Sequence, residues 1–220
     1  MPNEARASAY PTTFTLTGDI IFTDKDEATL FPWDRAIFFD EEGNDFLAHL
    51  IPGPSTPTRE DGWYTIRHMR CSTRPFKLVD NGDDHVRKVP EEVDGSHHTK
   101  EVMDWTNMSA SGIAVLKDID SNRKKGNLMG LSFLGTELGW NRFDLRFKCA
   151  DELDIPQPTK PFPLVSFEGI IHKHYADGIP EIHATHLLPL AQADDDLVRH
   201  LTDGWAKDIF VQQQETRREL

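Results

Sequence analysis

Short apolar segments, separated by clusters of glycine, proline, aspartate and asparagine, run through most of this 220-residue chain. They are rich in phenylalanine, isoleucine, valine and threonine, which favour β-strands. This punctuation is typical of an all-β domain rather than of alternating βαβ units. We therefore predict a mainly-β protein with strands at 13–23, 35–39, 46–51, 63–70, 75–79, 112–117, 128–134, 142–148, 164–175 and 181–188.

The clearest single strand contains an alternation of large apolar and charged residues. Phe143, Leu145 and Phe147 alternate with Asp144 and Arg146. Because successive side chains of a strand point to opposite faces, the three apolar residues should lie in the core and the two charged residues in water.

A barrel would leave no sheet edge exposed, and the chain has no obvious edge protection. We therefore expect residues 1–220 to form a single antiparallel β-barrel domain, OB-like or lipocalin/jelly-roll-like, with a long loop at 81–99. A C-terminal helix is predicted at 195–215, because an apolar residue recurs at every fourth position. This stripe consists of Leu197, Leu201, Trp205 and Ile209, and Asp194, Asp195 or Asp196 can cap the helix.

The charge and the cysteine content restrict the partners and the compartment. The chain has 37 acidic and 24 basic residues and a formal net charge of −13, which disfavours binding of nucleic acid or anionic lipid over the whole surface. The stretch 110–150 is the exception, with seven bases and four acids. Two cysteines, no signal-like segment and no apolar run long enough to span a bilayer predict a soluble intracellular protein, in the cytoplasm and not in a membrane.

Four of the ten histidines lie within fifteen residues that have the form of a hairpin around Asp177-Gly178. With this turn, His172 should pair with His183, and His174 with Glu181. Paired residues lie on one face with Cβ atoms about 5 Å apart. The hairpin therefore predicts a divalent-metal site made of His172, His174, His183 and Glu181. The alternative is a group of surface histidines without a ligand.

Aromatic and basic residues are interleaved in two further strands. Trp63 and Arg67 occur in one, and Trp140 and Arg142 in the other, so these four are candidate ligand-binding residues. Such pairs can stack on bases and hold phosphates, as in single-stranded nucleic-acid binding by OB-like barrels. Core packing of the aromatic rings is the alternative.

No complete catalytic set appears in the sequence, and whether the chain is an enzyme stays open. We predict a non-catalytic binding or assembly module built on a β-barrel, with a protein partner or a small-molecule ligand. The first alternative is a small-molecule enzyme that acts in the barrel interior through a His/Glu acid-base or metal site. The second is a single-stranded nucleic-acid-binding protein, for which nucleic acid is the less favoured partner.

Overall fold

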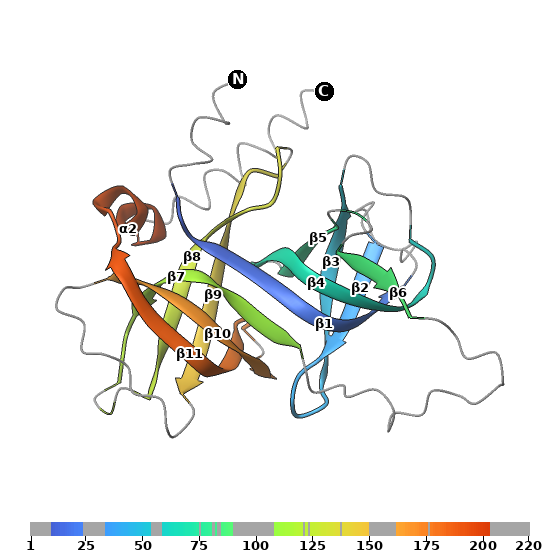
Figure 1. The fold of residues 1–220 in the computed structure, drawn as a ribbon, viewed down its shortest axis with the longest axis horizontal. Helices are drawn as coiled ribbons and strands as arrows, with labels where there is room; N and C mark the ends of the chain where they lie inside the picture. Colours follow the sequence, from blue (N-terminus) through green and yellow to red (C-terminus); the bar gives the residue numbers. More distant parts are fainter. Residues whose placement is uncertain are drawn as a thin grey trace.

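The computed structural model describes residues 10–23, 34–53, 59–74, 76–80, 82, 85–89, 108–120, 122, 124–136, 138–149, 162–175 and 177–202. Eleven strands and one helix make up the described chain (Figure 1). In chain order they are β1 (Thr13–Thr23), β2 (Asp34–Phe39), β3 (Asp45–Pro52), β4 (Gly62–Thr73), β5 (Phe76–Asp80), β6 (Val86–Lys88), β7 (Ser109–Lys117), β8 (Lys125–Phe133), β9 (Trp140–Cys149), β10 (Pro163–His174), β11 (Pro180–Gln192) and α2 (Asp195–Thr202).

Strand pairing closes two rings of five strands each. In the first ring, β1 pairs with β2, β2 with β3, β3 with β5, β5 with β4, and β4 with β1. In the second ring, β7 pairs with β8, β8 with β9, β9 with β11, β11 with β10, and β10 with β7. We call these the first and the second barrel. They join where β1 pairs with β7, and Figure 1 shows β1 crossing the molecule between them.

The two barrels have the same topology. If the five strands of each barrel are counted in sequence order, the third and the fifth are parallel neighbours, namely β3 with β5 and β9 with β11. Every other pair within a barrel is antiparallel. The joint between the barrels is itself symmetric: Thr13 pairs with Ile113 and Thr17 with Ser109, with Thr15 and Ser111 at the centre. A half-turn about this centre exchanges β1 with β7, and the molecule is therefore a pseudo-symmetric double barrel.

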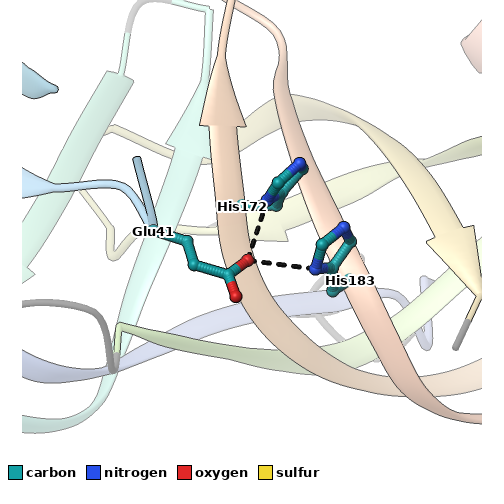
Figure 2. A group of neighbouring side chains, drawn as sticks. All are labelled: Glu41, His172 and His183. Carbon is teal, nitrogen blue, oxygen red and sulfur yellow. Dashed lines mark hydrogen bonds and ion pairs between the residues drawn. The ribbon is translucent and has the colours of Figure 1, made fainter. Parts of the chain in front are cut away.

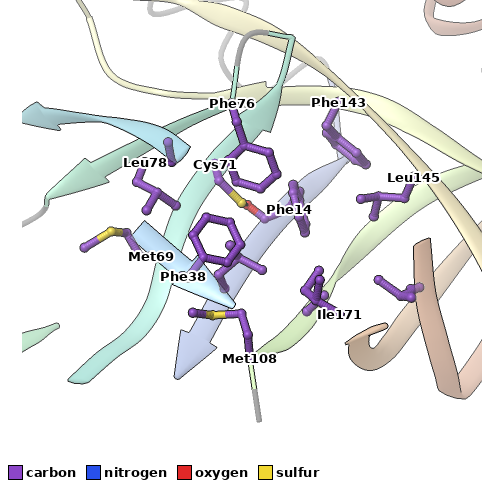
Figure 3. Close-up of a cluster of buried hydrophobic side chains, with 14 of the residues drawn as sticks. Phe14, Phe38, Met69, Cys71, Phe76, Leu78, Met108, Phe143, Leu145 and Ile171 are labelled. Carbon is purple, nitrogen blue, oxygen red and sulfur yellow. The ribbon is translucent and has the colours of Figure 1, made fainter. Parts of the chain in front are cut away.

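One continuous core joins the two barrels, as Figure 3 shows. Phe14 lies near its middle, with ring centroids 5.4 Å from Phe143 of the second barrel and 6.3 Å from Phe76 of the first. Leu145 and Phe147 are also buried, so the predicted alternation along β9 is confirmed for its apolar residues.

The structure confirms a mainly-β fold with a closed barrel and a helix near the C-terminus, but a single antiparallel barrel was the wrong description. The sheet is mixed, since β3–β5 and β9–β11 are parallel. All ten predicted strands are present, and β6 is an additional strand inside the predicted loop 81–99. The sequence pattern marks where strands begin and end, but partner choice depends on contacts that are distant along the chain.

The helix α2 begins where the aspartates predicted it. The side chain of Asp194 accepts a hydrogen bond of 2.6 Å from the backbone N–H of Leu197, so Asp194 is the N-cap. Leu197 and Leu201 are buried against the second barrel. The rest of the predicted helix, with Trp205 and Ile209, lies outside the described residues.

Candidate metal centre

Three side chains from separate elements meet on the outside of the second barrel. His172 comes from β10 and His183 from β11, while Glu41 comes from the turn between β2 and β3 in the first barrel (Figure 2). The imidazole Nδ1 of His172 lies 2.8 Å from Oε2 of Glu41, and Nδ1 of His183 lies 3.0 Å from the same oxygen. The two rings stack with centroids 3.6 Å apart and planes 18° apart.

Strand register places His172 beside His183, next to a β-bulge. In the β10–β11 ladder, Ile171 pairs with Ile182 and Lys173 pairs with Glu181, so His172 is the extra residue. Both isoleucines are fully buried, which fixes their side of the sheet as the core. His172 follows Ile171 and His183 follows Ile182, so strand alternation turns both histidines to the outer face. His172 is then the diagonal neighbour of His183, whose direct partner is Ile170.

The turn that carries Glu41 is held against β10 by several bonds. The backbone N–H of Glu41 donates to the carbonyl oxygen of Ile171 over 3.1 Å, which adds a ladder-like contact between the barrels. Lys173 Nζ donates to both carboxylate oxygens of Glu42, at 3.1 and 3.0 Å. This contact raises the pKa of Lys173, so the ammonium stays charged. The backbone hydrogen bond of Glu41 and the ion pair of the next residue, Glu42, thus hold Glu41 against β10.

The spacing of the three groups suits a metal ion. Their ligand atoms all lie within 4.8 Å of one another. Zinc binds imidazole nitrogen and carboxylate oxygen at about 2.0–2.2 Å, so two of its ligand atoms are separated by at most about 4 Å. The Nδ1–Oε2 distances of 2.8 and 3.0 Å fall inside that limit.

One ring nitrogen of His183 has no hydrogen-bond partner among the described residues. A carboxylate only accepts hydrogen bonds, so both Nδ1 atoms carry hydrogen when they bond to Glu41. Nε2 of His183 is buried and has no hydrogen-bond partner. A buried polar atom without a partner costs about 1–3 kcal/mol. Nε2 is the ring nitrogen of His183 that does not face Glu41, so a metal ion bound at Nδ1 would leave it unpaired.

The predicted hairpin register was wrong, although two of its histidines do meet. Gly178 forms the turn with a positive φ of 78°, as the sequence indicated, but His183 pairs with Ile170 and Lys173 pairs with Glu181. The bulge at His172 and the longer loop shift the ladder relative to a two-residue turn. His172 and His183 come together as diagonal neighbours on one face and not as a directly opposed pair.

The other two predicted ligands lie elsewhere. His174 pairs with Pro180, and its ring stacks on Phe46 with centroids 4.9 Å apart and planes 3° apart. Glu181 accepts a hydrogen bond of 3.2 Å from the hydroxyl of Tyr175, and burial together with this carboxylate raises the pKa of that phenol. Neither residue belongs to the group of Glu41, His172 and His183.

Glu41 is the candidate ligand that the sequence did not reveal. It is 131 residues from His172 in the chain, so no local pattern links the two. The only local signal is the short gap between the predicted strands 35–39 and 46–51, where the structure has a turn with Gly43 at a positive φ of 80°. Its position against β10 follows from the packing of one barrel on the other.

The candidate ligand-binding residues are divided between the two barrels. Trp63 and Arg67 lie on β4, where Trp63 stacks with Phe39 at 6.5 Å and Arg67 is exposed. Trp140 and Arg142 lie on β9.

The pair on β9 contacts groups around α2. The ring of Trp140 packs edge-on against Tyr10, with centroids 5.1 Å apart. Arg142 bonds both oxygens of Asp144 and donates to the carbonyl oxygen of Leu201 at 2.8 Å. These contacts favour a packing role for the second pair.

Comparisons with protein-family models, curated proteins and solved structures found no match for this chain. Among the described residues, none of the helical structure is long and apolar enough to cross a membrane. The case for a function therefore depends on the geometry of the site.

Proposed function

We propose that this chain is a non-catalytic binding module whose site holds a divalent first-row metal ion through Glu41, His172 and His183. The observation that carries the proposal is the approach of two imidazole nitrogens to one carboxylate oxygen at 2.8 and 3.0 Å. Imidazole and carboxylate together suit zinc and its first-row neighbours.

The position of the site gives the metal ion a structural effect. Glu41 belongs to the first barrel, and both histidines belong to the second. An ion shared by the three residues would hold the β2–β3 turn on the β10–β11 hairpin. Metal that binds the folded protein only would stabilise it by mass action.

Metal binding by the full chain, purified without a histidine tag, tests the proposal. Visible absorption during titration with Co²⁺ reports the ligand set, and elemental analysis after dialysis against Zn²⁺ reports the stoichiometry. We expect one ion per chain. Glu41→Gln, His172→Gln and His183→Gln should each weaken Co²⁺ binding by about tenfold or more, because loss of even an outer-shell partner has that effect.

Two further variants are matched controls. His186→Gln removes an exposed histidine three residues after His183 on the same strand, and His174→Gln removes a predicted ligand that stacks on Phe46 instead. Both should bind Co²⁺ as the unchanged chain does. Failure of the unchanged chain to bind Co²⁺ or Zn²⁺, or an equal loss in the His186→Gln variant, would overturn the proposal.

A further inference from the structure

A row of basic side chains continues the candidate metal centre across the second barrel. His183 of β11 is the Cα partner of Lys148 on β9, and Lys148 is the partner of Lys125 on β8. Partners in register point to the same face of a sheet. The outer face therefore carries, in order across four strands, His172, His183, Lys148 and Lys125.

The two lysines repel one another unless a negatively charged group lies between them. Like charges directly opposite one another destabilise a sheet. Lys125 and Lys148 are both exposed, and within the described part of the chain neither has a carboxylate partner. The neighbouring bases on this face differ, because each pairs with an acid: Lys117 with Asp118, Arg146 with Asp177, and Lys173 with Glu42.

The first barrel has bases at the equivalent positions. Arg35 of β2 pairs with His49 of β3, and His49 pairs with Lys77 of β5, so this row matches Lys125, Lys148 and His183 strand by strand. In the first barrel Lys77 is buried, and its Nζ donates to Oδ1 of Asn141 at 3.1 Å. Lys77 is thus covered by the protein itself, and Arg35 and His49 are half-buried, whereas Lys125 and Lys148 of the second barrel face solvent.

We propose that the second barrel binds a phosphate monoester, whose oxygens occupy open positions on the metal ion while Lys148 and Lys125 neutralise its remaining charge. The inference rests on the proposed metal function. Three protein ligands leave a zinc-like ion at least one open position. The ion with Glu41 carries one net positive charge, and the two ammonium groups add two more. Lysine is a common point-charge partner of phosphate.

The charge of the whole chain makes this patch distinctive. A formal net charge of −13 repels anions from most of the surface. A local group of two lysines beside a metal ion reverses that field over a small area. The size of the group fits one phosphate and not a long polyanion, which would also meet the surrounding acids.

Phenyl phosphate is the probe, added to the Co²⁺-loaded full chain at a constant salt concentration of about 150 mM. We expect a saturable change in the visible Co²⁺ spectrum. Lys148→Met and Lys125→Met should each weaken phenyl phosphate binding by about tenfold, as expected for loss of a charged partner, without weakening Co²⁺ binding. Lys117→Met is the matched control, since Lys117 lies on the same face but pairs with Asp118.

The outcomes separate this inference from the metal proposal. Normal Co²⁺ binding with no phenyl phosphate effect would overturn the phosphate site and leave the metal site standing. Absence of Co²⁺ binding would overturn both. Benzoate that binds as tightly as phenyl phosphate would overturn the assignment to phosphate. An equal loss of phenyl phosphate binding in Lys117→Met and Lys148→Met would show an effect of overall charge only, and would overturn the role given to Lys148. Melting temperatures of the three variants report whether each is folded.

Discussion

Asp144 is the residue at which the sequence pattern and the structure differ most instructively. Its neighbours Phe143 and Leu145 are buried as the alternation predicted, yet Asp144 is only 8% exposed. It lies between two arginines, with Arg142 Nη2 at 2.9 Å and Arg74 Nε at 3.0 Å. A charge can be buried when it is paired and bonded. Alternation predicts which face of a strand is apolar, but it does not predict which polar residues find partners.

His49 lies on the outer face of the first barrel and has a lowered pKa. Burial is the largest cause, and the positive charges of Lys77 and Arg35 act in the same direction. The folded protein therefore binds a proton at His49 less readily than the unfolded chain does. Stability should fall as the pH drops below the usual histidine pKa of about 6.5, and the loss is complete below the folded pKa.

The substitution His49→Gln tests this coupling. Urea unfolding between about pH 7.5 and pH 5.5 should show a smaller loss of stability in the variant than in the unchanged chain, because the site no longer titrates. An identical pH dependence in the two proteins would contradict the assignment. His186→Gln serves as the control for loss of an exposed histidine.

At the scale of elements, α2 depends on a strand for its C-terminal end. Arg142 of β9 donates to the carbonyl oxygen of Leu201, one of the carbonyls that a helix leaves without an internal partner. The same guanidinium bonds Asp144. One side chain thus joins the helix end to a buried carboxylate.

Replacement of Arg142 should therefore be costly. Arg142→Leu removes the contact with Leu201 and leaves Asp144 with Arg74 as its cation, so we expect a loss of about 2–4 kcal/mol in the free energy of unfolding. Arg199→Leu is the control, since the pair of Arg199 with Asp196 is exposed and worth at most about 0.5 kcal/mol. Equal losses measured by urea unfolding would show that the Arg142 contacts contribute nothing particular.

The predictability of each element follows from the range of its contacts. The start of α2 depends on residues within one turn, and Asp194 with Leu197 was sufficient to find it. The β10–β11 hairpin was also found, but its register depends on a bulge at His172 that the turn residues do not encode. The position of Glu41 depends on another barrel altogether. The sequence therefore revealed two histidines of the candidate site and missed its carboxylate.

At the scale of the whole molecule, the joint between the barrels is unusually close. A Cβ atom built on Gly112 of β7 would lie 2.0 Å from the carbonyl oxygen of Thr13 and 3.1 Å from a ring carbon of Phe167. Backbone cannot give way as a flexible side chain can. The absence of a side chain at this position is therefore required for β1 to approach β7.

Gly112→Ala should weaken the joint strongly. We expect a loss of at least about 1–3 kcal/mol, the usual effect of forcing extra atoms into a packed site. Ser111→Ala, one residue away, removes only the hydroxyl that bonds Thr15 at 3.0 Å and should cost about 0.5–1.5 kcal/mol. Thermal unfolding of the two variants provides the comparison, and a Gly112→Ala protein as stable as Ser111→Ala would contradict the predicted clash.

The double-barrel topology was not visible in the sequence. The pattern of apolar segments gave ten of the eleven strands but showed no repeat, because corresponding strands share burial and register and not residue identity. Arg35 and Lys125 hold equivalent places and are both basic, whereas Phe14 corresponds to Ala110 in the symmetric joint. Side-chain volume can differ between the halves provided that the shared core is filled.

The symmetry of the β1–β7 joint also bears on how such a molecule can arise. A contact that maps onto itself under a half-turn, with Thr15 facing Ser111 at the axis, is isologous, the kind that joins two identical subunits in a closed dimer. A chain containing one barrel could form this contact with its own copy. The present chain has the geometry of such a dimer after duplication and fusion, which frees each half to diverge, so that Lys77 is buried in one barrel while Lys125 and Lys148 are exposed in the other.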